Sequence, residues 1–383
     1  MLFVPPLKVI AAVPFVVTLC NDSEMQQFFK KTEFCLSPDE EWKVIMKKKM
    51  PNDVYPLPLQ EKFMNLMKPI HYEFEMWKEQ HGKFIGKNFD QRIINKIHWK
   101  SDGTIDRLKT ASFLIQSDVL PMKHRFRLAC NYWQEESVLS IWEQMSAGFQ
   151  DDFQEVQMHD IPQRLASLCS SDINVTQWIR WYSERNTTNT RQKERFWAYN
   201  WDIVSLQGLL TEKLTPKERL QIIQYVIHRN YSPHAGRFCV LLMKADQRLE
   251  VLKINPYPVL ESFLLWPGQR LFIEMANHVK NDLTKDHFLC LLHIIFCQRI
   301  LPNFEDFDYF ELLREFWLLI PNECKNFLKG FDIYEPIALI VSKGRLELPA
   351  LQKYLLHEQR HESNTRKCCM RIRYIKNLEY FRM

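Results

Sequence analysis

Glycine is scarce in this chain, with 9 residues among 383. Glycine forms the tight turns of sheet-rich folds and the phosphate-binding loops of nucleotide-binding folds. The sequence also lacks an Asn-Gly hairpin signal and the motifs G-x-G-x-x-G, G-x-x-x-x-G-K-[ST] and G-x-S-x-G, which mark dinucleotide-binding, P-loop and α/β-hydrolase proteins. These absences favour an all-α fold. Hydrophobic residues make up 46% of the chain, which is ample for a buried core.

Most of the chain lacks an excess of either charge. The formal net charge of +5 comes from 51 Lys and Arg against 46 Asp and Glu. Residues 360–383 hold seven of the basic and two of the acidic residues, so the other 359 residues hold 44 of each sign. We therefore expect no nucleic-acid partner for the body of the protein, and we expect any electrostatic attraction to come from the C-terminal tail.

The ten cysteines form no C-x-x-C motif. They are scattered, mostly within apolar stretches, which is the usage of a reducing compartment. An even number permits disulfides without indicating them. We expect a cytoplasmic protein.

The first twenty residues leave a second interpretation open. The apolar run Val9–Cys20 has the length of the apolar core of a secretion signal, although Pro14 interrupts it and no A-x-A cleavage site follows. It is too short to span a membrane as a helix. We favour an apolar segment that packs on the body, with a secreted or membrane-anchored protein as the alternative.

Helix start signals recur along the chain. Ser37-Pro-Asp-Glu40 and Thr215-Pro-Lys-Glu218 have the form of capping boxes with proline at the first helical position. Thr284 and Pro121 precede two further helical stretches. We expect roughly eighteen to twenty helices, mostly of about 8–16 residues, joined by short connections.

Apolar residues also repeat at helical spacing in pairs of stretches. Residues 125–145 read as a helical hairpin with a break near Glu135–Ser137. Two apolar stripes flank this break: Phe126, Ala129, Cys130 and Trp133 before it, and Val138, Ile141, Trp142 and Met145 after it. A similar spacing of apolar residues occurs at residues 237–245 and 287–297, and a second stretch rich in Leu, Phe and Trp follows each of them.

This pattern of paired helical stretches resembles that of helical-repeat proteins of the ankyrin, HEAT and tetratricopeptide kind. Neither the ankyrin motif T-P-L-H nor the tetratricopeptide motif W-x-x-L-G is present in the sequence. The resemblance implies an α-solenoid with a protein-binding concave face, and it transfers no site residue. We divide the chain into an apolar segment 1–20, a helical region 21–104, a helical-repeat body 105–345 and C-terminal helices with a basic tail, 346–383.

Residues 357–361, HEQRH, match the zincin pattern H-E-x-x-H. On a helix, His357 and His361 lie on one face about 6 Å apart and can bind one Zn²⁺. Glu358 can then take a proton from the zinc-bound water. A zinc-dependent hydrolase, with His357 and Glu358 catalytic and His357 and His361 as metal ligands, is therefore an alternative function.

Several features weigh against this alternative. Arg360 places a cation between the two ligands, and no Gly-x-x-His follows to provide a third. Only 22 residues remain after His361, with Glu379 the one acidic residue beyond Glu362. We favour a polar helix end in solvent, no metal and no enzyme.

One further group of metal-ligand residue types follows Thr284. His287, Cys290, His293 and Cys297 fall on one helix face, but the first and last are about 15 Å apart along the axis and cannot share one ion. We expect a buried helix with packed cysteines and hydrogen-bonded histidines.

The tail 366–383 alternates cations with apolar residues. Its candidate binding residues are Arg366, Lys367, Arg371, Arg373 and Lys376. The favoured interpretation is a capping helix with a polar outer face. An amphipathic helix that contacts an acidic membrane surface, a partner groove or RNA is the alternative.

The sequence therefore predicts a non-enzymatic protein–protein interaction scaffold, or adaptor, with a protein or peptide partner and no cofactor or small-molecule substrate. Membrane contact through the tail or the apolar N-terminal segment stays open, and nucleic acid is disfavoured.

Overall fold

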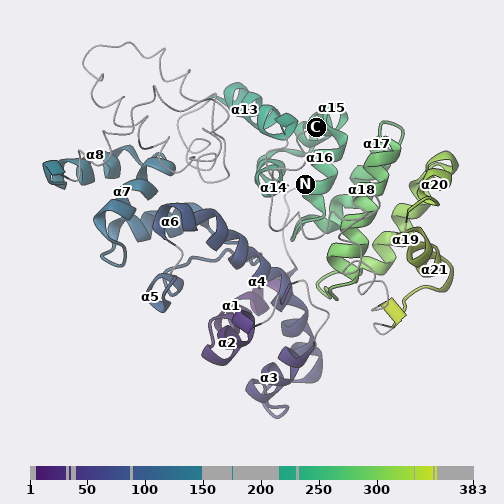
Figure 1. Cartoon of the computed structure of the whole chain (residues 1–383), viewed down its shortest axis with the longest axis horizontal. Coiled ribbons are helices and arrows are strands. Elements are labelled where there is room, and N and C mark those ends of the chain that lie inside the picture. The colour runs from purple at the N-terminus through teal and green to yellow at the C-terminus, as the bar shows by residue number, and fades with distance from the viewer. Residues whose placement is uncertain are drawn as a thin grey trace. The chain divides into compact units, whose positions relative to one another are not determined.

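The structure is a computed structural model, and it describes residues 6–31, 34–35, 40–86, 89–148, 175, 215–229, 233–331, 333–347 and 350–351 (Figure 1). These residues form 17 α-helices, one 3₁₀-helix and one π-helical turn. Within the described ranges the only β pairing is an isolated bridge between Trp99 and Ile105. The all-α prediction is confirmed. None of the described helices is long and apolar enough to cross a membrane.

The first eight helices are α1 Leu7–Cys20, α2 Ser23–Lys31, α3 Glu41–Lys49, α4 Leu57–Ile85, α5 Gln91–Ile94, α6 Arg107–Gln116, α7 Met122–Asn131 and α8 Glu135–Gln144. The later helices are α13 Pro216–Arg229, α14 Pro233–Leu242, α15 Ala245–Ile254, α16 Pro256–Phe263, η1 Gly268–Leu271, α17 Phe272–Val279, α18 Lys285–Ile295, η2 Phe296–Ile300, α19 Tyr309–Leu319, α20 Asn322–Leu328 and α21 Tyr334–Lys343.

The chain divides into two compact units. Unit 1 comprises residues 1–72, 101–103 and 224–383, and unit 2 comprises residues 73–100 and 104–223. The long helix α4 contributes its first part to unit 1 and its remainder to unit 2. Each unit is described by itself below.

The apolar N-terminal run of unit 1 forms helix α1, which continues through Pro14. Its buried side chains are Val9, Ala12, Val13, Val16, Leu19 and Cys20. Contacts between the rings of Phe15 and Phe63, 4.3 Å apart, join α1 to α4, and α2 packs on both α1 and α3. The apolar character of α1 is therefore used in the core, because its buried face lies against the first part of α4.

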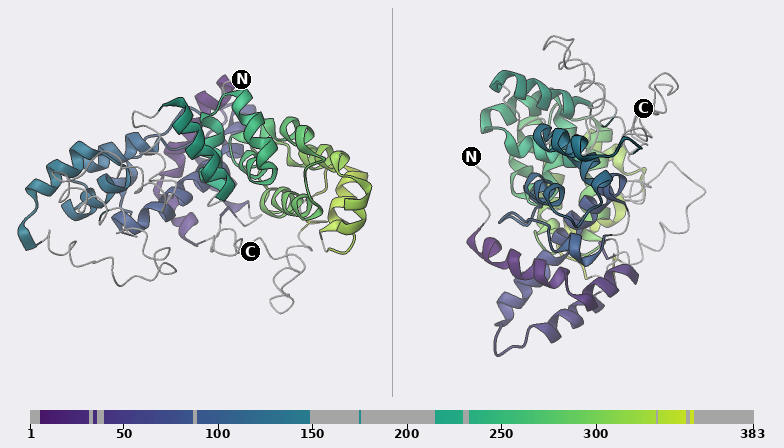
Figure 2. Two further views of the ribbon diagram at one scale, coloured as in Figure 1. Left: turned by 90° about the horizontal axis from the view of Figure 1, so that it is seen from above. Right: turned by 90° about the vertical axis from the view of Figure 1, so that its left-hand side faces the viewer.

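The C-terminal helices of unit 1 pack in a regular order (Figures 1 and 2). Each helix contacts the helix two places further along the chain: α14 with α16, α16 with α18 and α18 with α20, and likewise α15 with α17, α17 with α19 and α19 with α21. Contacts between sequence neighbours, such as α15 with α16 and α18 with α19, join the two series.

Unit 2 continues from α4 through α5 to α8, and α7 packs on both α6 and α8. The predicted break near Glu135–Ser137 is wrong, because these residues form the first turn of α8. The chain turns instead at Tyr132–Gln134, where Trp133 adopts a left-handed φ of 55°. A tryptophan in that conformation is rare, and its apolar spacing gives no sign of it.

At the described helix starts that the sequence indicates, Thr215 and Thr284 act as capping residues. Thr215 and Glu218 form a reciprocal capping box, with Thr215 N–H to Glu218 Oε2 at 2.8 Å and Glu218 N–H to Thr215 Oγ1 at 3.3 Å. The Thr284 hydroxyl accepts from the N–H of His287 at 3.2 Å. The predicted box at Ser37–Glu40 lies mostly outside the described residues.

Candidate functional site

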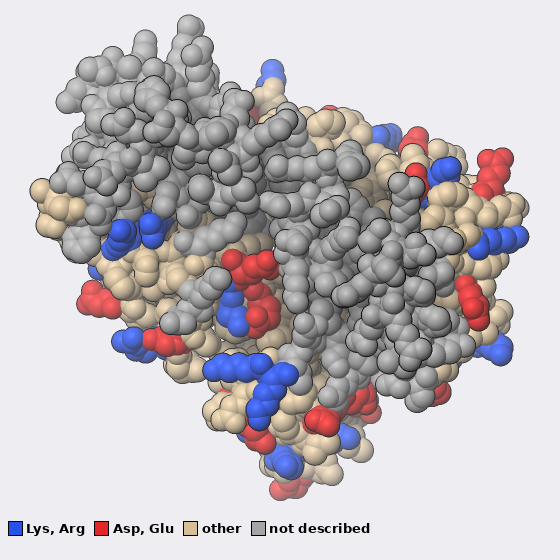
Figure 3. Space-filling model, in the orientation of Figure 1, with Lys and Arg blue, Asp and Glu red and all other residues tan. Residues whose placement is uncertain are grey.

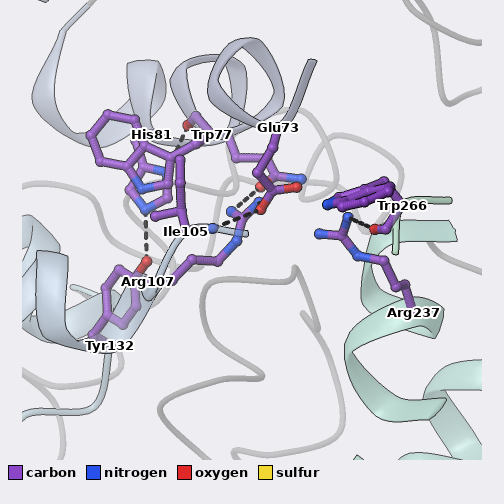
Figure 4. Close-up of polar contacts among 9 residues, drawn as sticks. Glu73, Trp77, His81, Ile105, Arg107, Tyr132, Arg237 and Trp266 are labelled. Atoms are coloured by element: carbon purple, nitrogen blue, oxygen red, sulfur yellow. Dashed lines mark hydrogen bonds and ion pairs between the residues drawn. The ribbon is translucent and has the colours of Figure 1, made fainter. Parts of the chain in front are cut away.

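A buried ion pair lies on one face of α4 in unit 2 (Figure 4). The Arg107 guanidinium lies 3.5 Å from the Glu73 carboxylate, and both side chains are 2% exposed. Arg107 also donates to the side-chain oxygen of Gln80, and the Ile105 N–H donates to Glu73 at 3.4 Å. Glu73 and Gln80 share a helix face because they are two turns apart. The pair therefore holds residues 105–107 against α4.

About two turns along α4 from Glu73, His81 contacts Trp77 and Tyr132 (Figure 4). His81 Nδ1 lies 2.7 Å from the Trp77 carbonyl oxygen, and Nε2 lies 2.7 Å from the Tyr132 hydroxyl. A carbonyl can only accept, so Nδ1 carries the proton and Nε2 accepts from Tyr132. The imidazole stacks on Trp77 with ring centroids 4.4 Å apart.

These groups are placed for structure rather than for proton transfer. Burial, and then the nearby charge of Arg107, lower the pKa of His81 to about 3. The imidazole is therefore neutral at pH 7 with both nitrogens engaged, and it cannot serve as a general base for a substrate. Removing one member of a buried ion pair such as Glu73–Arg107 typically costs about 3–5 kcal/mol.

Unit 1 buries two cations against one aromatic ring. Lys68 Nζ lies 5.8 Å and the Arg299 guanidinium carbon 5.0 Å from the centre of the Phe304 ring. Lys68 also donates to the Pro302 carbonyl, and Arg299 donates to the Leu264 carbonyl at 3.4 Å. Burial lowers the pKa of Lys68 to about 8. The two cations bind backbone carbonyls at the C-terminal ends of helices, an arrangement that joins α4, α16 and η2.

A buried carboxyl group lies close to these cations. The Tyr309 hydroxyl donates to Asp306 Oδ2 at 3.0 Å, and the Gln269 side-chain amide lies 2.9 Å from the Tyr309 hydroxyl. Burial raises the pKa of Asp306 to about 6, against the opposing effects of Arg299 and the Tyr309 hydrogen bond. Asp306 therefore changes its charge within the range of ordinary solution pH.

The segment 101–103 is fixed within unit 1 by a second pair of contacts, of which Figure 4 shows the one between Arg237 and Trp266. Trp266 Nε1 donates to the Asp102 carbonyl at 2.8 Å, and Arg237 donates to the Trp266 carbonyl at 2.7 Å. Both bonds are to backbone carbonyl oxygens.

The histidines and cysteines of α18 do not form a metal site. His287 is half-buried and caps its own helix, since its Nδ1 accepts from the Thr284 N–H at 3.3 Å. His293 and Cys297 are buried, and the helix changes to a π-helical turn at Phe296, between them. His293 corrects the expectation of hydrogen-bonded histidines, because neither of its ring nitrogens has a hydrogen-bond partner among the described residues. Throughout the described ranges, no three His, Cys, Asp or Glu side chains come together in a way that could hold a metal ion.

The candidate residues of the predicted zinc site and basic tail lie outside the described residues. They are His357, Glu358, His361, Arg366, Lys367, Arg371, Arg373 and Lys376. Their roles stay predictions.

Sequence analysis missed the buried charged residues of both units. Lys68 and Glu73 stand in the apolar stretch 63–77 of α4, on its buried face. A charged residue within an apolar stretch could have indicated a buried polar contact, because charged residues are rarely buried without a partner.

On the face drawn in Figure 3, basic and acidic side chains of the described parts are interspersed.

The chain was compared with family models, curated proteins and solved structures, and none of them matches it.

Proposed function

We propose that this chain is a non-enzymatic interaction scaffold, in which stacked helical hairpins bind a protein or peptide partner. The observation that carries the proposal is the packing of α14 to α21, in which each helix contacts the one two places further along. This order is the one that a two-layered stack of hairpins requires. One layer would hold α14, α16, α18 and α20, and the other would hold α15, α17, α19 and α21.

The repeats in this proposal are degenerate. The helices of the first layer begin at residues 233, 256, 285 and 322, which are unequal intervals. A stack of this kind is held by the apolar faces of neighbouring helices rather than by a consensus motif, which fits the absence of the ankyrin and tetratricopeptide signatures.

The chemistry of the described ionisable groups also supports a binding role. His81, Lys68 and Asp306 are each engaged by internal partners, and their shifted pKa values arise first from burial. Groups of this kind strengthen a scaffold, whereas a catalytic centre presents such groups to a substrate.

The second layer is the proposed partner face. Ile254 at the end of α15 and Leu318 near the end of α19 are exposed aliphatic side chains on that layer. Solvent-exposed aliphatic residues on separate hairpins of one layer can act as anchors for a partner, because their burial adds about 1.5–3 kcal/mol each.

The test is capture of partners from cells on the purified chain, followed by isothermal titration with the recovered partner. Ile254→Glu with Leu318→Glu should weaken binding by at least tenfold, while the matched control Leu242→Glu, exposed on α14 of the other layer, should bind like wild type. Equal weakening by both variants, or no partner that binds directly, would overturn the proposal.

Zinc content provides an independent check. The scaffold proposal expects no stoichiometric zinc in the purified full chain. About one zinc per chain in wild type and none in His361→Ala would instead favour the hydrolase.

A further inference from the structure

The connection between α3 and α4, together with the first turn of α4, carries an unusual run of exposed apolar side chains. In the described ranges, Val54 is 60%, Leu57 62% and Leu59 40% exposed. They belong to the continuous stretch Val54-Tyr-Pro-Leu-Pro-Leu59, which we call the apolar tip. Aliphatic side chains that are more than half exposed project into solvent rather than line a groove.

The apolar tip is held in place by the structure beneath it. The Tyr55 ring lies 5.0 Å from the ring of Phe15 on α1 and 6.1 Å from the ring of Phe63 on α4. The buried side chain of Gln60 donates to the Tyr55 carbonyl and to Asn52 Oδ1, both at 2.8 Å. The apolar side chains are therefore presented by a fixed loop, and little conformational entropy is lost when they bind.

Cations surround the apolar tip. Lys47 and Lys48 are exposed in the last turn of α3, just before the tip, and Lys62 follows Leu59 by one turn of α4. Lys8 lies two turns before Phe15 on the face of α1 that contacts α4. Burial, and then the charges of Lys8 and Arg270, lower the pKa of Lys62, so both of these cations act electrostatically on Lys62.

Acidic groups near the tip are fewer. Asp53 and Glu61 are exposed beside it, and the carboxyl of Asp306 acts on Lys62 from the interior. Lys8, Lys47, Lys48, Lys62 and Arg270 make no ion pair within the described residues. Residues 47–62, which include the tip, hold four lysines against two acidic residues, so the charge balance of this segment is positive.

Projecting aliphatic side chains ringed by cations are complementary to a lipid surface. The side chains can enter the boundary between headgroups and acyl chains, and lysines contribute about 1 kcal/mol each near an anionic surface. A peptide partner would need a groove on this side, and the apolar tip projects instead. We propose that unit 1 docks on an anionic membrane surface through Val54, Leu57 and Leu59, with Lys8, Lys47, Lys48 and Lys62 facing the headgroups. This inference goes beyond the proposed scaffold function and uses different residues.

The test is co-sedimentation of the full-length protein with vesicles. One set contains phosphatidylcholine alone, and the other contains phosphatidylcholine with about one third phosphatidylserine. Wild type should bind the anionic vesicles, and Val54→Asp with Leu57→Asp should lower the partition coefficient by at least about tenfold. Leu242→Asp is the matched control, since Leu242 is 48% exposed on α14 of the same unit and lies outside the proposed partner face, and it should bind like wild type.

A second variant separates the two components of binding. Lys47→Gln with Lys48→Gln, at exposed positions, should reduce binding to anionic vesicles by about tenfold or more and reduce its salt dependence. The proposal is overturned if wild type does not bind, if it binds both vesicle sets equally, or if the tip variant and the Leu242 control lose binding alike. Loss of partner capture by the Ile254 and Leu318 variants, with vesicle binding intact, would keep the two proposals separate.

Discussion

His293 is the described residue whose burial is hardest to explain by its own contacts. Its side chain is buried on α18, and neither ring nitrogen has a hydrogen-bond partner. A neutral imidazole carries one donor and one acceptor, and an unsatisfied buried polar group costs about 1–3 kcal/mol. We expect His293→Leu, which has a similar volume, to raise the free energy of unfolding in urea by about 1–2 kcal/mol.

His287 provides the contrast on the same helix. Its Nδ1 accepts the Thr284 N–H, and its ring stacks on Tyr257 with centroids 5.1 Å apart. His287→Leu removes both interactions and should lower the free energy of unfolding by about 1 kcal/mol. If His293→Leu were as destabilising as His287→Leu, the His293 imidazole would have a partner and the explanation would be wrong.

The sequence identifies buried positions better than it identifies their partners. Helical spacing places Lys68 and Glu73 on the apolar face of α4. What stabilises them is distant in the chain: the Pro302 carbonyl is 234 residues from Lys68, and Arg107 follows Glu73 by 34 residues. Hydrogen bonds of that kind depend on the tertiary fold, so a single sequence does not specify them.

Among helices, the capping residues at N-terminal ends were more predictable than turns and helix distortions that depend on packing. The boxes at Thr215 and Thr284 were predictable because each involves residues three apart. The turn at Trp133 and the π-helical turn at Phe296–Ile300 were not, since both depend on how neighbouring helices pack. The π-helical turn also changes the spacing between His293 and Cys297 that the sequence suggested.

The contact between α14 and α16 is close enough to require glycine. A Cβ built on Gly236 would lie 2.3 Å from Ser262 Oγ, which donates to the Pro258 carbonyl at 2.8 Å. Gly236→Ala should therefore lower the free energy of unfolding by about 1–3 kcal/mol, through displacement of that hydroxyl. Urea denaturation measures the change.

A double-mutant cycle tests this explanation. In a Ser262→Ala background the nearest remaining atom is the Cβ at 3.6 Å, an ordinary contact. There Gly236→Ala should be neutral or stabilising by up to about 1 kcal/mol, because alanine favours the helix. A Gly236→Ala penalty of the same size in both backgrounds would show that the hydroxyl is not its cause.

At the scale of the whole molecule, the fold class could be predicted from the sequence, but the residues that make up each compact unit could not. The shortage of glycine and the helical spacing of apolar residues are properties of the whole chain, and both indicate an all-α protein. Which residues form a compact unit is a different matter. Residues 101–103 belong with the C-terminal helices through Trp266, although their neighbours on both sides belong to unit 2. Such an assignment depends on long-range contacts, including the close approach of Gly103 to Ile70 and Val13, which a single sequence does not specify.

Each of the two units contains a titrating group, and the two groups have opposite effects on how folding stability depends on pH. His81 in unit 2 has its pKa lowered from 6.5 to about 3, so between these values the unfolded chain binds more protons and stability falls as pH decreases. Asp306 in unit 1 has its pKa raised from 3.8 to about 6, so the folded state binds more protons there and stability rises as pH decreases. Each slope is about 1.4 kcal/mol per pH unit.

Hydrogen exchange measured by mass spectrometry at pH 7 and pH 5, after correction for intrinsic rates, should resolve these effects. Lowering the pH should reduce protection in peptides of α4 and α7 around His81 and Tyr132, and increase it in peptides of η1 and α19 around Asp306. Asp306→Asn keeps an acceptor for Tyr309 but cannot titrate, so its unit 1 peptides should lose the pH dependence while those around His81 retain it. Protection that fell equally in both units, or an unaltered unit 1 profile in Asp306→Asn, would mean that these two groups do not control acid stability.

The opposite pH dependence of stability in the two units matters for function. Near pH 5, unit 2 of the proposed scaffold would weaken first. The helices of unit 1, which are proposed to bind partners and membrane, would become more stable at the same pH.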